Sequence, residues 1–355
     1  MKNICFLIGN LDYSGGTERV TSLIANDLVK EDFSISILSF FGGKDPFFDL
    51  DKNIKISSLF DKQVSFKRRY FNTIYKIRSF IKSNSIDILI VVDSNSCIFT
   101  IPALIGLKVK HICWEHFNFK YNLGKPSRDI ARKLAAHYCD SIVTLTEEDK
   151  KFWIEGTSHN DQIITIPNPS PFQVKEKFNQ DVNRVVIAVG RLVPQKGFDL
   201  LLESWVEVNK SMPLWKLMIV GDGQDREKLE TYITVNNLQD SVKLLGNTDN
   251  VSIYYEKADI FCLSSRFEGF GMVLIEALSF GLPIVSFDCE VGPSEILSKT
   301  GSILVPPEDI EKLSLSLIEL MNDDIRRAEI RKDSLIKAKT YQIDKIIGDW
   351  IAILT

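Results

Sequence analysis

The chain has 355 residues, of which 45% are hydrophobic and 25% charged, and its formal net charge is −4. This apolar content excludes disorder as the main state, and at about 150 residues per domain the length predicts two domains. The lack of a basic excess argues against a general nucleic-acid binder.

Six cysteines are spread along the chain without a CxxC pair: Cys5, Cys97, Cys113, Cys139, Cys262 and Cys289. A disulfide framework or a zinc site would have tighter spacing, so we expect reduced, mostly buried thiols in a cytoplasmic protein. The apolar run at residues 4–8 is too short for a membrane span, and so is every other run. We therefore expect neither a signal peptide nor an integral membrane segment.

Short apolar runs alternate with helix-like segments in the first half of the chain. Helices are predicted at 16–30 and 127–138. The predicted strands are 3–9, 34–40, 86–92, 110–114, 141–145 and 163–166. Near-continuous Ile, Val and Leu are typical of strands covered on both faces, and their alternation with helices predicts an α/β fold with a doubly wound parallel sheet.

The pattern restarts after a Pro-rich break at 166–171 and a polar stretch at 173–183, which we interpret as the linker. Further strands are predicted at 184–190, 215–220, 242–245, 259–263, 284–287 and 302–305, with helices at 197–209, 225–237, 271–280 and 308–321. Two similar domains are therefore expected. Ligands of open α/β sheets bind beyond the carboxyl ends of the strands, which predicts a site in the cleft between the domains.

Three segments carry candidate ligand-binding residues. Gly15 and Gly16 begin a predicted helix, whose free N–H groups and dipole favour an anion, although a tight turn is the simpler alternative. Neither GxGxxG nor a Walker loop is present, which removes the main support for nicotinamide or ATP binding. Arg191 and Lys196 follow a strand and offer a guanidinium fork and a point charge for phosphate, unless both are only solvated loop cations.

The segment 264–277 is the most specific of the three. Glu268 lies in a loop with Gly269 and Gly271, which let a ligand approach the backbone. Glu276 interrupts the apolar run MVLIEAL, where a carboxylate needs a partner such as a ribose diol. The structural alternative is a helix cap followed by a satisfied core glutamate.

Histidines and metal patterns add one candidate. His116 follows the strand at 110–114 and is expected to point into the same cleft, whereas a structural role beside aromatics is the alternative. His111, His137 and His159 receive no role. Asp49 and Asp51 have DxD spacing by chance in a polar loop, so no metal site is expected.

Taken in order, these motifs resemble the retaining glycosyltransferases of family 4, which have the GT-B fold of two facing Rossmann-like domains. The resemblance covers essentially the whole chain. It is carried by Gly15-Gly16-x-Glu18, Glu115-His116, Ile166-Pro167-Asn168-Pro169, Gly190-Arg191 with Lys196-Gly197, Glu268-Gly269-Phe270-Gly271 with Glu276, Gly281-Leu282-Pro283 and Gly292-Pro293-Ser294-Glu295.

The resemblance implies a role for each motif. The catalytic set is Glu268 near the anomeric carbon, His116 on the donor sugar, and Arg191 and Lys196 on the departing diphosphate, with no metal. The substrate-binding set is Gly15, Gly16, Glu18, Asn168, Phe270, Gly271, Met272, Val273 and Glu276. One departure is Gln195, which stands where the family more often has Glu.

The Pro-rich break sets the domain limits, and the resemblance implies the role of each domain. The acceptor-binding domain is expected at 1–170, and the nucleotide-sugar-binding domain at 171–340. The stretch 341–355 is expected to form a helix that packs back on the first domain.

A basic segment points to the acceptor. Residues 62–86 hold seven Lys or Arg residues, interleaved with aromatics, and no acidic residue, which is typical of a surface that rests on anionic lipid. The alternative is a helix with a solvated basic face. Residues 1–170 hold 22 basic and 19 acidic side chains (net +3), and residues 171–355 hold 21 and 28 (net −7), so the near-neutral total is a sum of unlike halves.

The expected activity is transfer of a hexose or N-acetylhexosamine from a UDP-sugar to a saccharide acceptor that is lipid-linked, in bacterial surface polysaccharide synthesis such as O-antigen or lipopolysaccharide. The protein would lie in the cytoplasm, in peripheral contact with the inner face of the membrane. Alternatives are a GDP-sugar (mannosyl-type) transferase, a phosphorylase or epimerase of the same fold, and a non-catalytic nucleotide-sugar-binding subunit.

Overall fold

The computed structural model describes residues 1–159, 162–175 and 182–355, which form two compact units. The first unit comprises Met1–Pro171 and Ile343–Thr355, and the second comprises Phe172–Gln342. These limits differ by one or two residues from those expected from the sequence. Within the expected linker, residues 176–181 lie outside the described part of the chain.

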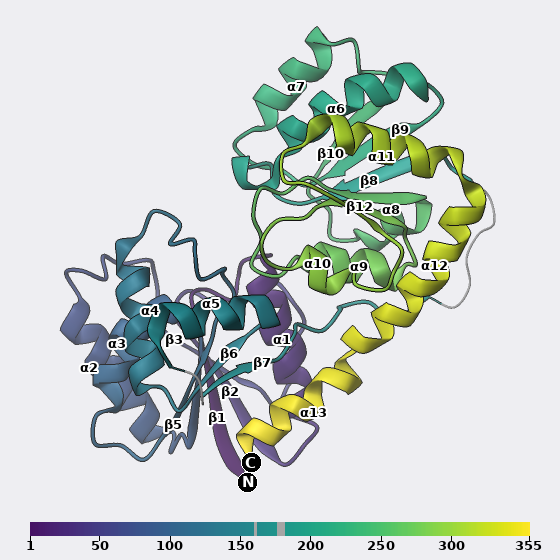
Figure 1. The fold of residues 1–355 in the computed structure, drawn as a ribbon. Coiled ribbons are helices and arrows are strands. Elements are labelled where there is room, and N and C mark those ends of the chain that lie inside the picture. Colours follow the sequence, from purple (N-terminus) through teal and green to yellow (C-terminus); the bar gives the residue numbers. More distant parts are fainter. Residues whose placement is uncertain (160–161, 176–181) are drawn as a thin grey trace. The chain divides into compact units, whose positions relative to one another are not determined.

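The first unit contains a parallel sheet of seven strands in the order β3-β2-β1-β4-β5-β6-β7 (Figure 1). The strands are β1 (Lys2–Ile8), β2 (Phe33–Phe41), β3 (Lys55–Phe60), β4 (Ile88–Val92), β5 (Lys110–Trp114), β6 (Ser141–Thr144) and β7 (Ile163–Thr165). The helices are α1 (Gly16–Leu28), α2 (Tyr70–Ser83), α3 (Cys97–Leu104), α4 (Pro126–Tyr138), α5 (Glu147–Thr157) and α13 (Ile343–Leu354).

The second unit contains a parallel sheet of six strands in the order β10-β9-β8-β11-β12-β13. The strands are β8 (Val185–Val189), β9 (Lys216–Val220), β10 (Val242–Gly246), β11 (Ile260–Leu263), β12 (Ile284–Phe287) and β13 (Ile303–Val305). The helices are α6 (Phe198–Ser211), α7 (Arg226–Val235), α8 (Ser252–Lys257), α9 (Met272–Ser279), α10 (Pro293–Ile296), α11 (Ile310–Asn322) and α12 (Asp324–Ala338).

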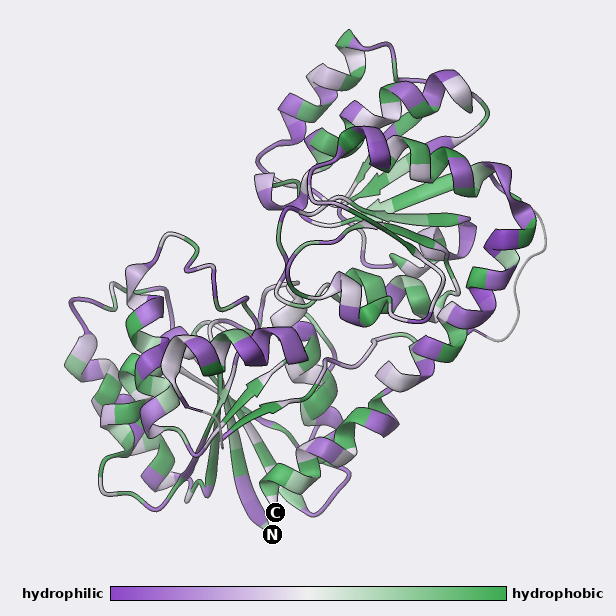
Figure 2. Cartoon of the chain, in the orientation of Figure 1, coloured by the Kyte–Doolittle hydropathy of each residue, from purple (hydrophilic) through white to green (hydrophobic). Residues whose placement is uncertain are grey.

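Apolar strands covered on both faces explain both sheets. In Figure 2 the strands are largely hydrophobic, whereas the helices carry alternating hydrophobic and hydrophilic stripes. Along β1, Cys5 and Leu7 belong to the core that also includes residues of α2, α3 and α4, while Phe6 faces the other way and contacts Trp114. The doubly wound α/β prediction is confirmed in each unit.

The missed elements lack the expected sequence signals. The strand β3 lies at the sheet edge, and only its last two residues are buried, so it has no continuous apolar run. The helix α3 is apolar on nearly every side and contains Pro102, which hides its helical period. The helix α12 is highly charged and short of apolar residues, which obscured its buried face.

The C-terminal helix α13 packs against the first unit. Trp350 is fully buried and meets Trp114 edge-to-face, with ring centroids 4.7 Å apart. The last carbonyls of α13 accept hydrogen bonds from two amines: Lys2 Nζ binds the Leu354 oxygen at 2.8 Å, and Lys110 Nζ binds the Ile353 oxygen at 2.6 Å. Cations at a helix C-terminus complement the helix dipole, which favours this docking.

Strand order reverses between β1 and β4 in the first unit and between β8 and β11 in the second. Ligands of open α/β sheets bind at such switch points, outside the carboxyl ends of the strands. A ligand-binding site is therefore expected at the loops that follow these four strands. Within the described residues, no helix combines the length and apolar character needed to cross a bilayer.

Candidate functional site

In the second unit, Lys196 and Glu268 meet at the switch point. Lys196 Nζ lies 2.7 Å from Glu268 Oε1, and Ser265 Oγ donates a hydrogen bond to the same oxygen at 2.6 Å. Glu268 is only 6% exposed, so burial without these donors would be costly. The two residues predicted from separate motifs thus form one partly buried group, and Ser265 is a member that the sequence did not reveal.

Two glycines allow the loops of this unit to approach closely. Gly197 has φ of 62°, and a Cβ there would lie 2.0 Å from the Ser264 carbonyl oxygen. Gly292 has φ of 105°, and a Cβ there would lie 2.1 Å from the Phe270 carbonyl oxygen. Any side chain at either position would push the loop containing Glu268 away from its neighbour.

Arg191 is placed differently from Lys196. It is exposed, and within the described part of the chain its guanidinium has no hydrogen bond or ion pair. A cation that follows β8 at the switch point and is not neutralised by the protein is available to an anionic ligand. This arrangement supports the phosphate-binding role expected for Arg191.

Gln195 stands where the resemblance leads one to expect Glu. Its side-chain Nε2 donates a hydrogen bond to the Phe267 carbonyl oxygen at 3.0 Å. The main-chain carbonyl oxygen of Gln195 accepts a hydrogen bond from the main-chain N–H of Arg266 at 2.8 Å. An ionised carboxylate has no N–H to donate, so a glutamate at this position could not make the hydrogen bond that the Gln195 amide makes. Arg266 adds a paired contact, with two guanidinium nitrogens at 2.9 Å from the Asp199 oxygens. The loops after β8 and β11 are therefore bonded together.

The predicted backbone contacts lie at the start of α9. Gly271 precedes the helix with φ of 96°, Phe270 is buried, and Met272 and Val273 are partly exposed in the first turn. The first N–H groups of a helix have no partner within it, and here no side chain caps them. This helix start is suited to an anionic or hydroxyl ligand.

Glu276, in the middle of α9, is 4% exposed, and its carboxylate has a hydrogen-bond partner within the chain. The Tyr255 hydroxyl donates a hydrogen bond to Glu276 Oε2 at 2.9 Å. Tyr255 is itself fully buried and stacks on Phe280, with centroids 5.2 Å apart. The sequence predicted that this carboxylate needs a donor but did not reveal Tyr255, because the two residues lie in different elements.

In the first unit, Gly15 precedes α1 without a side-chain cap. The Glu18 side chain folds back over Gly15, so that a Cβ there would lie 2.3 Å from Glu18 Oε2. Gly16 begins the helix. The loop before it is held by Asp12, whose carboxylate accepts hydrogen bonds from the Gly43 and Asp45 N–H groups. The three predicted residues thus share one helix start, where a negative carboxylate already lies.

His116 follows β5 and packs on Trp114, with ring centroids 4.4 Å apart. Its Nε2 atom is buried and has no hydrogen-bond partner among the described residues. Burial lowers the pKa of His116 from 6.5 to about 3, so the ring is neutral at physiological pH. An unpartnered buried nitrogen favours a ligand contact over a purely structural role.

Glu115, next to His116, holds a buried network that was not predicted. Its carboxylate accepts hydrogen bonds from Ser94 Oγ and, at 3.1 Å, from the His116 N–H, while Arg132 Nε lies 3.4 Å away. Arg128 lies between Glu115 and Asp93, at 3.6 Å and 2.7 Å. Burial and the Glu115 charge raise the pKa of Asp93 to about 6. Because the His116 N–H is one of the donors to Glu115, this network holds the His116 backbone in place.

Asn168, in the loop after β7, is 2% exposed, and its Oδ1 has no hydrogen-bond partner in the parts of the chain described. A buried amide oxygen without a donor is uncommon in folded proteins. Asn168 and His116 are therefore two predicted site residues of the first unit with an unsatisfied buried atom.

All six cysteines are free and buried, as predicted. Although the cysteines are spread along the sequence, Cys97 and Cys139 come together with His111 in the first unit. The residues are far apart in sequence, so no spacing motif marked them.

Two family models match the chain. Residues 14–170 match the model described as "Glycosyltransferase Family 4", and residues 170–335 match "Glycosyl transferases group 1". Together they span nearly the whole chain.

Curated relatives match over the full length. A glycosyltransferase of Haemophilus influenzae is 39% identical, with 100% of both chains covered. The amylovoran biosynthesis glycosyltransferase AmsD of Erwinia amylovora is 29% identical, again with 100% of both covered. A Campylobacter jejuni alpha-1,4-N-acetyl-D-galactosaminyltransferase, whose name specifies a PP-undecaprenol-linked substrate, is 30% identical over 100% of this chain and 98% of its own length.

The fold is shared with a solved structure. A variant of TarM from S. aureus, in complex with fondaparinux, alpha-GlcNAc-glycerol and UDP, has a TM-score of 0.84 and 17% identity, with 100% of both chains covered. The family models, the full-length relatives and this fold agree, and the chain belongs to the family 4 glycosyltransferases with the GT-B fold.

Proposed function

We propose that this chain is a retaining, metal-independent hexosyl- or N-acetylhexosaminyltransferase that uses a UDP-sugar in bacterial surface polysaccharide synthesis. The observation that carries the proposal is the largely buried Lys196–Glu268 pair at a switch point, together with Arg191 after the same strand, whose guanidinium has no partner among the described residues. The printed names of two relatives, for amylovoran biosynthesis and for an undecaprenol-linked glycan, support the pathway, and UDP in the TarM complex supports the nucleotide.

The chemistry assigned to the second unit is departure of a diphosphate. The bond between the anomeric carbon and the phosphate oxygen breaks, the nucleotide leaves with the electron pair, and an acceptor hydroxyl bonds to that carbon and releases its proton. Arg191 and Lys196 are assigned to the developing phosphate charge, a task for which two fixed cations suffice. Glu268 is assigned to the transferred sugar, and Glu276 to the ribose beside Tyr255.

In the first unit, Gly15 and Gly16 are assigned to the diphosphate and His116 to the donor sugar. The neutral His116 ring accepts or donates a hydrogen bond through Nε2, and it does not act as a cation. Glu18 must rotate away from Gly15 before a phosphate can approach the start of α1, since the two negative groups repel each other.

The acceptor is proposed to be lipid-linked, and α2 with its preceding loop is proposed to rest on the inner face of the cytoplasmic membrane. Phe71 and Tyr75 are 83% and 70% exposed on α2, and Ile105 after α3 is 69% exposed. Arg78 reaches from α2 to the Ile105 carbonyl oxygen at 2.7 Å, so these elements adjoin. Exposed cations of the same segment are Lys62, Lys67, Arg68, Arg69, Lys76 and Lys82. The other aromatics are largely structural, since Phe66 and Tyr70 pack against the core.

The test is a panel of UDP- and GDP-sugars, scored first by thermal stabilisation and then by hydrolysis and transfer with and without EDTA. We expect one UDP-sugar to raise Tm and to be turned over equally in both buffers, with the anomeric configuration retained by NMR. If only GDP-sugars raise Tm, the donor is a GDP-sugar and not a UDP-sugar. Binding without turnover on any acceptor would favour a non-catalytic subunit.

A further inference from the structure

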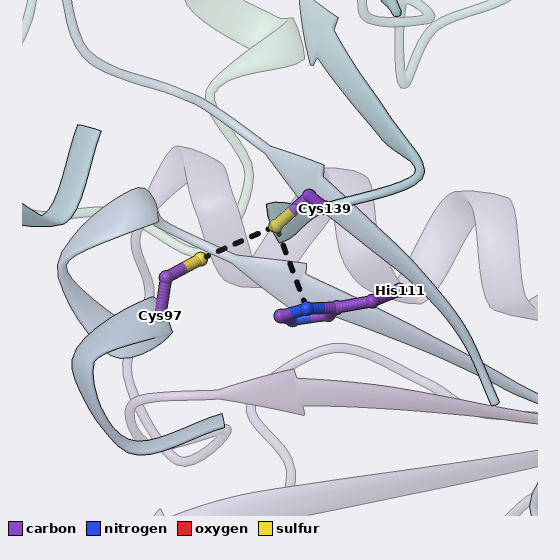
Figure 3. A group of neighbouring side chains, drawn as sticks. All are labelled: Cys97, His111 and Cys139. Carbon is purple, nitrogen blue, oxygen red and sulfur yellow. Dashed lines mark hydrogen bonds between the residues drawn. The ribbon is translucent and has the colours of Figure 1, made fainter. Parts of the chain in front are cut away.

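A compact cluster of sulfur and nitrogen atoms lies inside the first unit. Cys97 is the first residue of α3, His111 lies near the start of β5, and Cys139 caps the end of α4. Figure 3 shows the three side chains pointing toward one another, with Cys139 between the other two. Cys139 Sγ lies 4.0 Å from Cys97 Sγ and 3.5 Å from His111 Nδ1, and all three residues are buried.

These separations match the edges of a tetrahedral zinc site. With Zn–S near 2.3 Å and Zn–N near 2.0 Å, tetrahedral angles place two sulfur ligands about 3.8 Å apart and a sulfur and a nitrogen about 3.5 Å apart. The observed 4.0 Å and 3.5 Å therefore require shifts of only tenths of an ångström.

Thr100 prepares the histidine for this role. Its Oγ1 lies 3.0 Å from His111 Nε2 and within 3.5 Å of the Ser96 carbonyl oxygen. When the hydroxyl donates to Ser96, its oxygen accepts the Nε2 proton, which leaves Nδ1 unprotonated and facing Cys139. Metal-ligating histidines usually have such a partner on the second ring nitrogen.

Cys113 is the candidate for a fourth ligand, and its sulfur lies outside the group of three residues whose ligand atoms all fall within 4.8 Å of one another. It is two residues after His111 on β5, so both side chains face the same side of the sheet, and its side chain lies in the same buried core cluster as Cys97 and Cys139.

We propose that Cys97, His111, Cys113 and Cys139 form a buried structural site for one Zn²⁺, or for another soft tetrahedral ion. Three thiolates and one imidazole are a known closed set for structural zinc, and binding releases the thiol protons. The site would fasten α3 and α4 to β5. It is separate from the transfer chemistry, because Glu115 and His116 follow the carboxyl end of β5, and His111 lies near its other end.

The test is the metal content of the full chain, expressed in zinc-supplemented medium and purified with a phosphine reductant and without chelator. We expect about one zinc per chain in the wild type and in the control Cys262→Ala, which removes a buried thiol from the other unit. In Cys97→Ala and Cys139→Ala the zinc content should fall at least tenfold. Wild-type protein with less than about a tenth of an equivalent of zinc, or cysteine variants that keep the metal, would overturn the proposal.

Cobalt substitution gives a second readout that does not need the variants to fold. Wild-type chain produced with Co²⁺ should show intense visible d–d bands of tetrahedral cobalt and thiolate-to-cobalt charge transfer. Cys113→Ala should weaken the charge transfer by about a third if three thiolates bind. Weak octahedral bands without charge transfer in the wild type would contradict the site even if every variant were unfolded.

Discussion

Lys196 Nζ donates a hydrogen bond to Glu268 Oε1 across 2.7 Å, which joins the loop after β8 to the loop after β11. The lysine side chain is 16% exposed and the glutamate side chain 7%, so this ion pair is shielded from water. The lysine proposed to neutralise the departing phosphate is thus already paired with the carboxylate assigned to the sugar.

The first prediction concerns this pair. Glu268→Ala should abolish transfer, by at least about a hundredfold in kcat, and leave UDP binding measurable, because it removes the group assigned to the sugar but none assigned to the nucleotide. Lys196→Ala, unlike Glu268→Ala, should weaken UDP binding in addition to reducing transfer. Transfer assays and calorimetry with UDP measure both effects, and near-normal turnover of Glu268→Ala would refute its role.

Arg191 should affect ligand binding without affecting stability. Since its side chain is exposed and makes no hydrogen bond within the described residues, Arg191→Ala should change the free energy of unfolding by less than about 0.5 kcal/mol. Affinity for UDP should drop by about tenfold or more, through loss of a charge-assisted contact. The matched control is Lys243→Ala, another exposed cation of the second unit, which should change neither quantity. Equal UDP affinities of the two variants would remove Arg191 from the site.

Tyr255→Phe tests how Glu276 is held. Loss of the hydroxyl deprives a buried carboxylate of a donor and should lower the free energy of unfolding by about 1–3 kcal/mol. UDP affinity should fall with it, because the carboxylate is no longer oriented. Tyr254→Phe, one residue earlier and only partly buried, is the control and should change stability by less than about 0.5 kcal/mol. Indistinguishable urea midpoints for the two variants would show that Tyr255 does not support Glu276.

Asp149 gives a pH prediction. Burial raises the pKa of this carboxyl from 3.8 to about 7, although it accepts a hydrogen bond from the Phe119 N–H at 2.8 Å. Its contribution to stability is therefore complete below 3.8 and is lost as pH rises through about 7.

The isosteric Asp149→Asn keeps an acceptor oxygen and cannot ionise. Relative to it, the wild type should lose on the order of 2 kcal/mol of unfolding free energy between pH 5 and pH 8. Urea titrations at both pH values measure this loss. The exposed Asp32→Asn should show no such difference, and parallel pH profiles of Asp149→Asn and wild type would contradict the raised pKa.

The membrane proposal predicts lipid binding that depends on charge. Neutralising Lys67, Arg68 and Arg69 to Gln should lower the partition coefficient for anionic liposomes, measured by flotation at low salt, by about a hundredfold, because each of the three cations near an anionic surface contributes about 1 kcal/mol. The control replaces three exposed lysines of the second unit: Lys243, Lys332 and Lys339. Unchanged flotation after neutralising the first set would refute the proposed surface.

The sequence by itself determined the fold class and the family. Continuous apolar strands, helices between them and a Pro-rich break are local signals, and the order of short motifs such as Glu268-Gly269-Phe270-Gly271 is read directly from the chain. The edge strand β3 and the charged helix α12 were not predicted from the sequence, because their positions are set by packing and not by a periodic apolar pattern.

Only the tertiary structure decided which side chains are partners. The donor to Glu276 is Tyr255, the tie from Gln195 is to Phe267, and Cys97 meets Cys139 and His111. These contacts join residues that are distant in sequence, and parallel strands with intervening helices bring them together at the sheet. Spacing along the chain carries no record of such neighbours, because the energy of burying a carboxylate or a thiol depends on the atoms packed around it.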